Sequence, residues 1–178
     1  RIVLDGEMPG RDAVSSTLLG LADLICVQSE ALAEALRAEG FNAIALPPGW
    51  SRQNSLWEQP SPRRHTINLG WIGPPGHVED VAEIRRPLIR LVREHPQTRL
   101  VIGGDPQVDR LFDRYRVAES RRLFLPPVNA EDTPSLLAEL DISLVPLRDT
   151  PSNRLESDLP LMAAGVRGIP WVASPTPA

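Results

Sequence analysis

The sequence NRLESDLPLMAAGVRGIPWVAS, residues 153–174, contains a polar loop, a short helix, a glycine stop and a buried strand in one continuous unit. Ser157 and Asp158 are residue types that cap helix N-termini, and Pro160 suits the first helical turn, where its missing N–H costs nothing. We therefore expect a helix that begins beside Ser157 or Asp158. Two glycines are placed to end this helix, Gly165 and Gly168.

The start of this helix is also a candidate anion site. Its free N–H groups and the positive end of its dipole face the loop at Asn153 and Arg154, an arrangement that suits a phosphate. An ordinary βαβ crossover uses the same caps and glycines, and most helix N-termini bind only water. The local chemistry alone therefore favours the ordinary crossover.

The rest of the chain alternates apolar runs with helical patterns. Strands are expected in the nearly continuous apolar runs Ile2–Leu4, Leu24–Val27, Ala43–Leu46, Ile67–Ile72, Leu100–Ile102, Leu123–Leu125, Ile142–Val145 and Trp171–Ala173. Helices are expected at Asp12–Leu21, Glu30–Glu39, Val78–Glu94, Gln107–Tyr115 and Ser135–Leu140. Strands of this kind alternating with helices indicate an α/β fold with a Rossmann-like parallel sheet that has helices on both faces.

Two domains are expected in this order. Residues 1–49 contain one βαβ unit of a partial α/β domain, whose incomplete sheet should be partly exposed and prone to association. Residues 50–65 have no clear period and carry Pro60 and Pro62, so we interpret them as a linker. Residues 66–178 form the larger Rossmann-like domain. Because Arg1 opens directly on a strand-like segment without a methionine, we expect the chain to be a piece of a longer polypeptide.

Composition excludes several classes of function. The formal net charge of −4 and the dispersed arginines argue against a nucleic-acid surface. No apolar run is long enough to cross a bilayer and no signal peptide is visible, so a cytoplasmic location is the default expectation.

All 19 basic residues are arginine, which excludes lysine chemistry within this chain. The single cysteine, Cys26, lies in an apolar run and is expected to be a buried thiol. The chain has no G-x-S-x-G motif, its three histidines lack metal-ligand spacing, and GWIGPPGH lacks the spacing of a nicotinamide-binding loop.

The order of the motifs is more specific than any one of them. The motifs run ADLICVQSEALAEALRAEG, IALPPG, INLGWIGPPGHVEDV, RLVIGGD, RLFLPPV, LLAELDISLVPL and NRLESDLPLMAAGVRGIPWVAS. Together they resemble the group 1, family 4-like glycosyltransferases of the two-domain GT-B fold, most closely those of polysaccharide and O-antigen assembly. The resemblance covers about residues 22–174. It implies that residues 1–49 end the acceptor-side domain and that residues 66–178 form the donor-side domain without its last helices.

The resemblance implies transfer of a sugar from a nucleotide diphosphate donor to a polysaccharide or other carbohydrate acceptor, with retention at the anomeric carbon. It implies no metal and no cofactor besides the donor substrate. In such a site, backbone N–H groups and arginines stabilise the diphosphate leaving group as its charge develops. The donor-binding residues carried over are Gly73 and His77 in a first loop, and Asn153, Arg154, Ser157 and Asp158 at the second. No catalytic residue is assigned.

Four positions depart from the family pattern. Relatives commonly carry a glutamate that hydrogen-bonds the ribose where this chain has Ala163, and many carry another where it has Leu155. Glu156 and Pro160 stand where close relatives tend to carry lysines, and the negative charge of Glu156 would repel the donor. Two hypotheses therefore remain open, an active glycosyltransferase and a glycosyltransferase-like domain that has lost catalysis and serves as a binding or scaffold module. Ordinary structural roles also remain open, with His77 as a helix cap, Gly73 as a turn residue and Arg154 as a solvated charge.

Overall fold

The computed structural model describes residues 2–4, 19–115 and 117–175. These residues group into two compact units. Unit 1 combines the described residues of 1–50 with segment 149–159, and unit 2 combines residues 51–148 and 160–175. The sequence places segment 149–159 within the second domain, whereas its contacts assign it to unit 1. The boundaries at residues 49 and 65 stay a prediction.

Unit 1 is built on a small parallel sheet of three strands in the order β1-β2-β3. Its elements are β1 (Ile2–Leu4), β2 (Ile25–Val27), α2 (Glu30–Ala38) and β3 (Ala43–Ala45). The side chain of Ser29 caps α2 by accepting the N–H of Leu32 at 3.2 Å. One face of the sheet packs on α2 through Leu19, Ile25, Val27, Leu32, Ala33, Leu36 and Ala43. The expected βαβ unit is confirmed, while most of the helix expected at Asp12–Leu21 lies outside the described residues.

Unit 2 contains a five-stranded sheet in the order β6-β5-β4-β7-β8, and every neighbouring pair is parallel. The strands are β4 (Ile67–Ile72), β5 (Thr98–Gly103), β6 (Arg122–Leu125), β7 (Ile142–Val145) and β8 (Trp171–Ala173). The Rossmann-like parallel sheet that the sequence predicts is therefore confirmed. The chain runs outward from β4 through β5 to β6, and then returns to the other side of β4 for β7 and β8.

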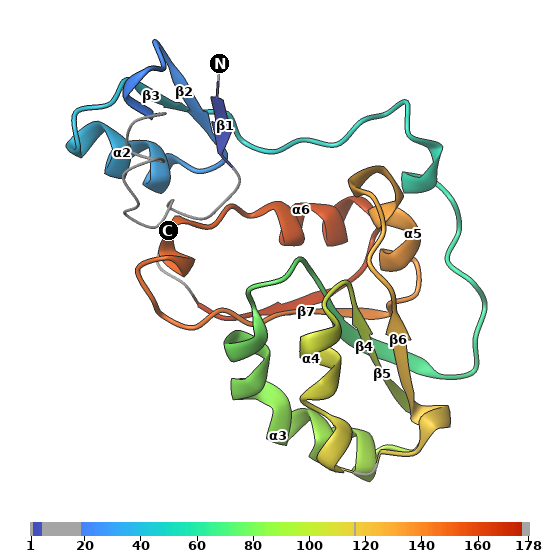
Figure 1. Ribbon diagram of the computed structural model, residues 1–178. Helices are drawn as coiled ribbons and strands as arrows, with labels where there is room; N and C mark the ends of the chain where they lie inside the picture. The colour runs from blue at the N-terminus through green and yellow to red at the C-terminus, as the bar shows by residue number, and fades with distance from the viewer. Residues whose placement is uncertain (1, 5–18, 116, 176–178) are drawn as a thin grey trace. The chain divides into compact units, whose positions relative to one another are not determined.

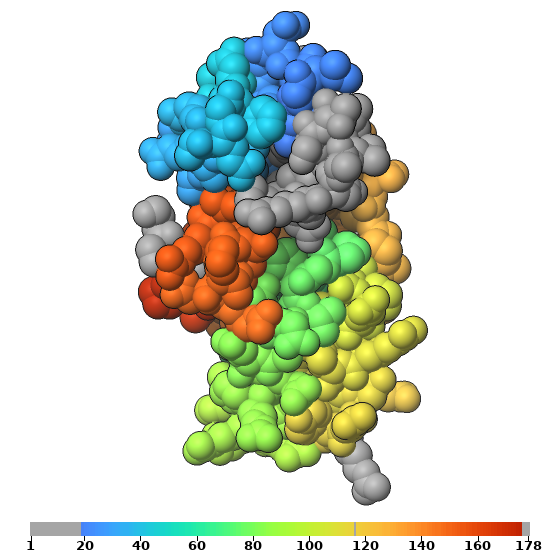
Figure 2. All heavy atoms as spheres, turned by 60° about the vertical axis from the view of Figure 1, so that its left-hand side comes forward, coloured from blue at the N-terminus to red at the C-terminus, as the bar shows by residue number. Residues whose placement is uncertain are grey.

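Helices cover both faces of this sheet, as Figure 1 shows. They are α3 (Val78–Glu94) and α4 (Pro106–Arg110) on one face, and α5 (Thr133–Leu137) and α6 (Leu159–Val166) on the other. The first face is filled by Leu69, Trp71, Val81, Leu88, Ile89, Val92, Leu100, Ile102, Val108, Phe112 and Leu144. The second is filled by Val101, Leu137, Leu140, Ala163, Ala164 and Ile169. Figure 2 shows α3, in green, against the yellow segment that begins with α4.

Several expected helix ends are corrected by the structure. The helix expected at Gln107–Tyr115 is divided into α4 and a 3₁₀ turn at Asp113–Tyr115, and Arg122 forms ion pairs with an aspartate from each part. The helix expected at Ser135–Leu140 is α5, which starts at Thr133 and ends at Leu137. Gly165 lies inside α6, whereas Gly168 follows it with φ +68° and is the glycine that ends the helix.

The segment read as a linker, residues 50–65, contains a 3₁₀ turn at Ser55–Trp57. Arg167, just after α6, donates from Nη1 to the backbone carbonyls of Leu56, Trp57 and Gln59 at 3.0, 3.0 and 2.6 Å. The Trp57 side chain also packs against the apolar cluster beneath α6. This part of the segment is therefore held on unit 2.

Candidate functional site

The strand order of unit 2 identifies one edge where a ligand site is expected. β4 is followed by a crossover to β5 on one side, and β7 lies on its other side. In doubly wound sheets, ligands bind outside the carboxyl ends of the strands where the order reverses in this way. Here that switch point is flanked by the loop Gly73–His77 after β4 and by Pro146–Arg148 after β7.

Close backbone packing fixes the loop after β4. The N–H of Gly73 donates to the carbonyl of Gly103 at 3.2 Å, and a Cβ on Gly73 would lie 2.5 Å from the Trp71 ring. Gly104 has φ +91°, and a Cβ there would lie 2.1 Å from the Gly73 carbonyl oxygen. Glycine is therefore required at position 104, a side chain at position 73 would displace the Trp71 ring, and the two loops at the ends of β4 and β5 lie in direct contact.

His77 occupies the N-cap position of α3, but its side chain makes no capping hydrogen bond. Instead Nδ1 lies 3.0 Å from Oδ2 of Asp80. The His77 ring is tilted by 54° against the Trp71 ring, with the centroids 6.2 Å apart. The cap role that the sequence left open for this side chain is therefore not observed, and its position is set by Asp80 and by the packing of β4.

Asp80 is a residue of this site that sequence reasoning missed. It is only 4% exposed, and its Oδ1 accepts the backbone N–H of Arg148 at 2.9 Å. The Arg148 guanidinium is near the same carboxylate, with Nε 3.7 Å from Oδ1. A sequence signal was present, because Asp80 is an acid on the buried stripe of α3 beside Val81. An acid on a buried helix face needs partners to offset its desolvation.

The other four predicted donor residues lie in unit 1, on segment 149–159. Arg154 is held by Asp149, with Nε to Oδ1 at 2.5 Å and Nη2 to Oδ2 at 2.8 Å. Hydrogen bonds from Arg154 lower the pKa of Asp149, and the same bonds raise the pKa of Arg154. Both side chains are more than half exposed. Arg154 is therefore not simply a solvated loop charge, because its guanidinium is paired with Asp149.

The same segment is tied to α2. Ser157 donates its hydroxyl to Oε1 of Gln28 at 3.2 Å, and the hydroxyl of Ser29 donates to the Leu155 carbonyl at 2.5 Å. The backbone N–H of Asn153 donates to the hydroxyl of Thr150 at 3.2 Å. Asp158 is exposed and directly precedes α6, so the expected start of that helix is confirmed. The segment carries three acids, Asp149, Glu156 and Asp158, against one arginine, a local formal charge of −2 that opposes anion binding.

The two positions where relatives commonly carry glutamates are packed against apolar side chains. Ala163 is 7% exposed and belongs to the cluster beneath α6. Leu155 packs against the core of unit 1. Both positions therefore contribute to packing, and no carboxylate is available at either of them to bind a ribose.

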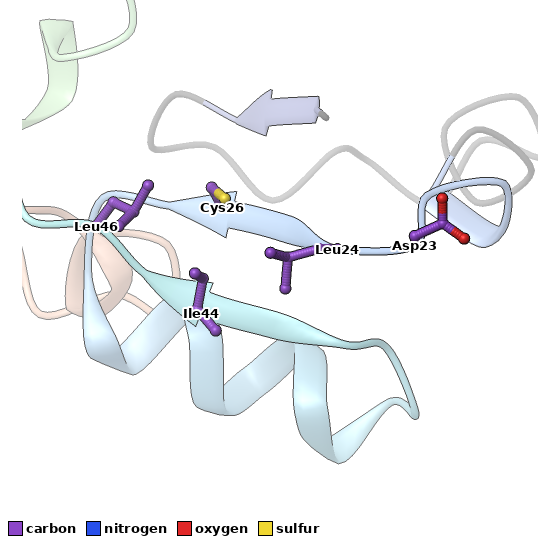
Figure 3. Close-up of a pocket in the computed structure, with 5 residues that line it drawn as sticks. All are labelled: Asp23, Leu24, Cys26, Ile44 and Leu46. Carbon is purple, nitrogen blue, oxygen red and sulfur yellow. The ribbon is translucent and has the colours of Figure 1, made fainter.

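A hollow in unit 1 is lined by Asp23, Leu24, Cys26, Ile44 and Leu46, as shown in Figure 3. Side chains alternate along a strand, and the neighbours of Cys26 and Ile44 on β2 and β3 pack toward α2. The hollow therefore lies on the opposite face of the small sheet, where Ile44 and Leu46 are 40% and 42% exposed. This confirms the partly exposed sheet that the sequence predicts. The thiol of Cys26 is buried, as expected.

The described residues show neither a metal-binding cluster nor a membrane-spanning helix. Residues 2–4, 19–115 and 117–175 contain no group of three or more His, Cys, Asp or Glu side chains placed to hold a metal ion. In the same residues, no helix combines the length and apolar character that a membrane span requires. A reaction without metal and a cytoplasmic location both stay predictions.

No protein-family model and no curated protein sequence matches the chain. Solved structures do match its fold. A point mutant of TarM from S. aureus, in complex with fondaparinux, α-GlcNAc-glycerol and UDP, aligns with a TM-score of 0.61 and 11% identity over 96% of this chain and 36% of TarM. Apo OtsA aligns with a TM-score of 0.54 and 14% identity over 88% and 49% of the two chains. UDP-GlcNAc 2-epimerase of Neisseria meningitidis, bound to UDP-GlcNAc, aligns with a TM-score of 0.52 and 16% identity over 93% and 48%.

At identities of 11–16%, these likenesses establish the fold. They confirm the α/β architecture that the resemblance to GT-B glycosyltransferases predicts. The chain spans between about a third and a half of the length of each of these three proteins.

Proposed function

We propose that this chain is part of a nucleotide-sugar glycosyltransferase, and that unit 2 binds the donor at the carboxyl ends of β4 and β7. The observation that carries the proposal is the switch point of the sheet, where a tight glycine loop, the His77 imidazole and the Arg148 backbone are held together. A glycine loop lets backbone N–H groups approach a diphosphate closely. Among the structures of the same fold, TarM was solved with UDP and the epimerase with UDP-GlcNAc, which supports a nucleotide diphosphate ligand.

The proposed reaction is transfer of a sugar to a carbohydrate acceptor with retention at the anomeric carbon and without a metal. As the bond to the diphosphate breaks, negative charge develops on the leaving group, and fixed N–H donors and guanidinium groups stabilise it. In the absence of lysine, arginine must supply the positive charge that this chain contributes. Arg148 brings one guanidinium to the end of β7, and Arg154 remains the predicted partner of the diphosphate from segment 149–159. The roles of Asn153, Ser157 and Asp158 in holding the donor also stay predictions.

A second candidate function is a binding or scaffold module that has lost catalysis. Three observations favour it: the buried Ala163, the packed Leu155, and the ion pair that engages Arg154 with Asp149. A lost ribose-binding carboxylate removes a charged hydrogen bond worth about 1.5 to 3 kcal/mol. The two candidates therefore differ in whether the chain binds a nucleotide diphosphate at all.

Calorimetric titration of the chain with UDP, GDP and ADP distinguishes the two candidates. If the donor site is intact, at least one nucleotide binds, and Arg154→Ala weakens that binding by about 1.5 to 3 kcal/mol because a charged hydrogen-bond donor is lost. Arg63→Ala, which removes an exposed arginine from segment 50–65, serves as the control and should leave the affinity unchanged. Absence of binding by all three nucleotides would contradict the glycosyltransferase proposal and leave the scaffold module.

A further inference from the structure

We propose that Asp80 is a positioning residue that sets the tautomer of His77 and anchors the loop after β7, so that one carboxylate organises both sides of the switch point. Each oxygen of the Asp80 carboxylate contacts a different loop. Oδ2 faces Nδ1 of His77 at 3.0 Å, and Oδ1 accepts the backbone N–H of Arg148 at 2.9 Å. The proposal that this arrangement serves a donor sugar rests on the proposed function, whereas the tautomer itself does not.

Burial of the Asp80 carboxylate costs desolvation free energy, which a residue with a purely structural role would not need to incur. Its side chain is 5% exposed, among the apolar side chains that α3 packs on the sheet. Moving a carboxylate out of water costs free energy that only good partners offset, and an apolar residue of similar size usually serves stability as well or better. An acid at the third position of a helix ordinarily reaches back to the N-cap backbone. Here the carboxylate reaches a side chain of the loop after β4 and the backbone of the loop after β7.

The contact with Asp80 decides which His77 nitrogen is left for a ligand. An ionised carboxylate can only accept hydrogen bonds, so Nδ1 must carry the hydrogen that points to Oδ2. In the neutral imidazole the other nitrogen, Nε2, then carries a lone pair. Nε2 can therefore act only as a hydrogen-bond acceptor, and the ligand group that it suits is a hydroxyl of the donor. The indole of Trp71, 6.2 Å from the ring, packs beside the imidazole.

Asp80→Asn separates the two roles of the carboxylate. The single amide oxygen of asparagine can keep the bond from the Arg148 N–H, which turns its NH₂ group toward His77. An NH₂ donor requires a lone pair on Nδ1, so the hydrogen moves to Nε2 and the ring can no longer accept from a hydroxyl. Asp80→Ala instead removes both bonds.

The tautomer is measured by ¹⁵N NMR of the histidine side chains in the unliganded chain, at a pH where imidazole is neutral. We expect the Nδ1–H form in the wild-type protein and the Nε2–H form in Asp80→Asn. Asp105→Asn is the matched control, because Asp105 is another buried acid, 2% exposed, whose Oδ1 caps α4 by accepting the N–H of Gln107. This control should leave the His77 tautomer unchanged. Hydrogen exchange at the Arg148 amide should accelerate in Asp80→Ala and stay slow in Asp80→Asn.

Titration with UDP-glucose and UDP-GlcNAc then tests the role in binding. Asp80→Asn should weaken the sugar nucleotide that binds by about tenfold or more, the effect of one lost hydrogen bond of about 1.4 kcal/mol. His77→Asn, whose amide can keep the bond to Asp80 but has no counterpart of Nε2, should weaken it to a similar degree. If the tautomer changes as expected but no sugar nucleotide binds the wild-type chain, the positioning role stands and the proposed function fails. An Nε2–H tautomer in the wild-type protein overturns the inference without any variant, and an unchanged tautomer in folded Asp80→Asn does so as well.

Discussion

Arg154 and Asp149 form a bidentate ion pair, with Nε to Oδ1 at 2.5 Å and Nη2 to Oδ2 at 2.8 Å. In this geometry, two N–H groups of the guanidinium each donate to one oxygen of the carboxylate. A diphosphate would have to compete with Asp149 for the same two N–H groups. The pair therefore determines how readily Arg154 can serve an anion.

The first prediction concerns the titration of Asp149. Hydrogen bonds from Arg154 lower its pKa from the ordinary value of 3.8. Because the folded-state pKa is the lower one, the pair stabilises the fold above the unfolded pKa and loses this contribution as the pH falls through the folded pKa. In Arg154→Ala the midpoint of Asp149 should return toward 3.8, as followed by NMR of its carboxyl carbon. Arg37→Ala removes the partner of Glu30 instead and should leave the midpoint unchanged.

The second prediction concerns Arg167, which holds segment 50–65 on unit 2 through three backbone carbonyls. Arg167→Ala leaves these carbonyls without their charged donor. We expect a loss of about 1.5 to 3 kcal/mol in the free energy of unfolding and faster hydrogen exchange at residues 55–59. Denaturant unfolding measures the first effect, with Arg63→Ala as the control. A variant with wild-type exchange in this segment would show that the guanidinium does not hold it.

The third prediction compares two glycines. Gly104 has φ +91°, and its Cβ would lie 2.1 Å from the carbonyl oxygen of Gly73, so Gly104→Ala must move the loop after β4. Backbone strain of this kind costs about 1 to 3 kcal/mol, and the steric contact adds to it. Gly165 is exposed inside α6 and a Cβ there meets nothing within 4 Å. Gly165→Ala should therefore stabilise the chain by about 0.5 to 1 kcal/mol. Thermal unfolding of both variants checks the opposite signs.

The sequence predicts the sheet of unit 2 well because its strands are nearly continuous apolar runs. β4, β7 and β8 have the expected bounds, and so does α3, which continues through Pro87. Helix ends were harder to predict, because they depend on partners distant in sequence. The helix expected at Gln107–Tyr115 is an example, because Arg122 pairs with Asp109 in α4 and with Asp113 in the 3₁₀ turn that follows.

The candidate site was only partly predictable for the same reason. Gly73 and His77 lie at the carboxyl end of β4, which the motif GWIGPPGH indicates. The role of Asp80 depends on Arg148, 68 residues later in the chain, and local pattern does not reveal such a pairing. The partners of Arg154 and Ser157 depend equally on how segment 149–159 folds back on itself and on α2.

The fourth prediction concerns the partly exposed face of the small sheet in unit 1. Ile44 and Leu46 are 40% and 42% exposed there, next to Leu24. Apolar patches on short sheets promote association, and we expect two copies of the chain to associate through this face at high concentration. Ile44→Arg should shift sedimentation toward the monomer. Ile67→Arg alters a residue of unit 2 with 41% exposure and should not. A wild-type chain that sediments as a monomer at every concentration contradicts the prediction.

The last prediction concerns Ala163, the position where relatives commonly carry a ribose-binding glutamate. On sequence grounds Ala163→Glu should restore that acceptor. The structure places the Ala163 side chain, 7% exposed, in the cluster with Val101, Leu137 and Leu140. A polar group buried in such surroundings costs about 1 to 3 kcal/mol when it lacks a partner, so we expect Ala163→Glu to lower the free energy of unfolding by that amount.

The pH dependence of this loss has a definite sign. Burial raises the pKa of a carboxyl group, so the new side chain is tolerated best when protonated and destabilises the fold increasingly as the pH rises above its unfolded value of about 4.3. Gly165→Glu, on the exposed side of α6, is the control and should show no such dependence.

If UDP restores the stability of Ala163→Glu at neutral pH, the ribose reaches this helix and the donor site is intact. If the loss persists with UDP, the packing of Ala163 has replaced the ribose contact, and the scaffold module becomes the better account of the chain.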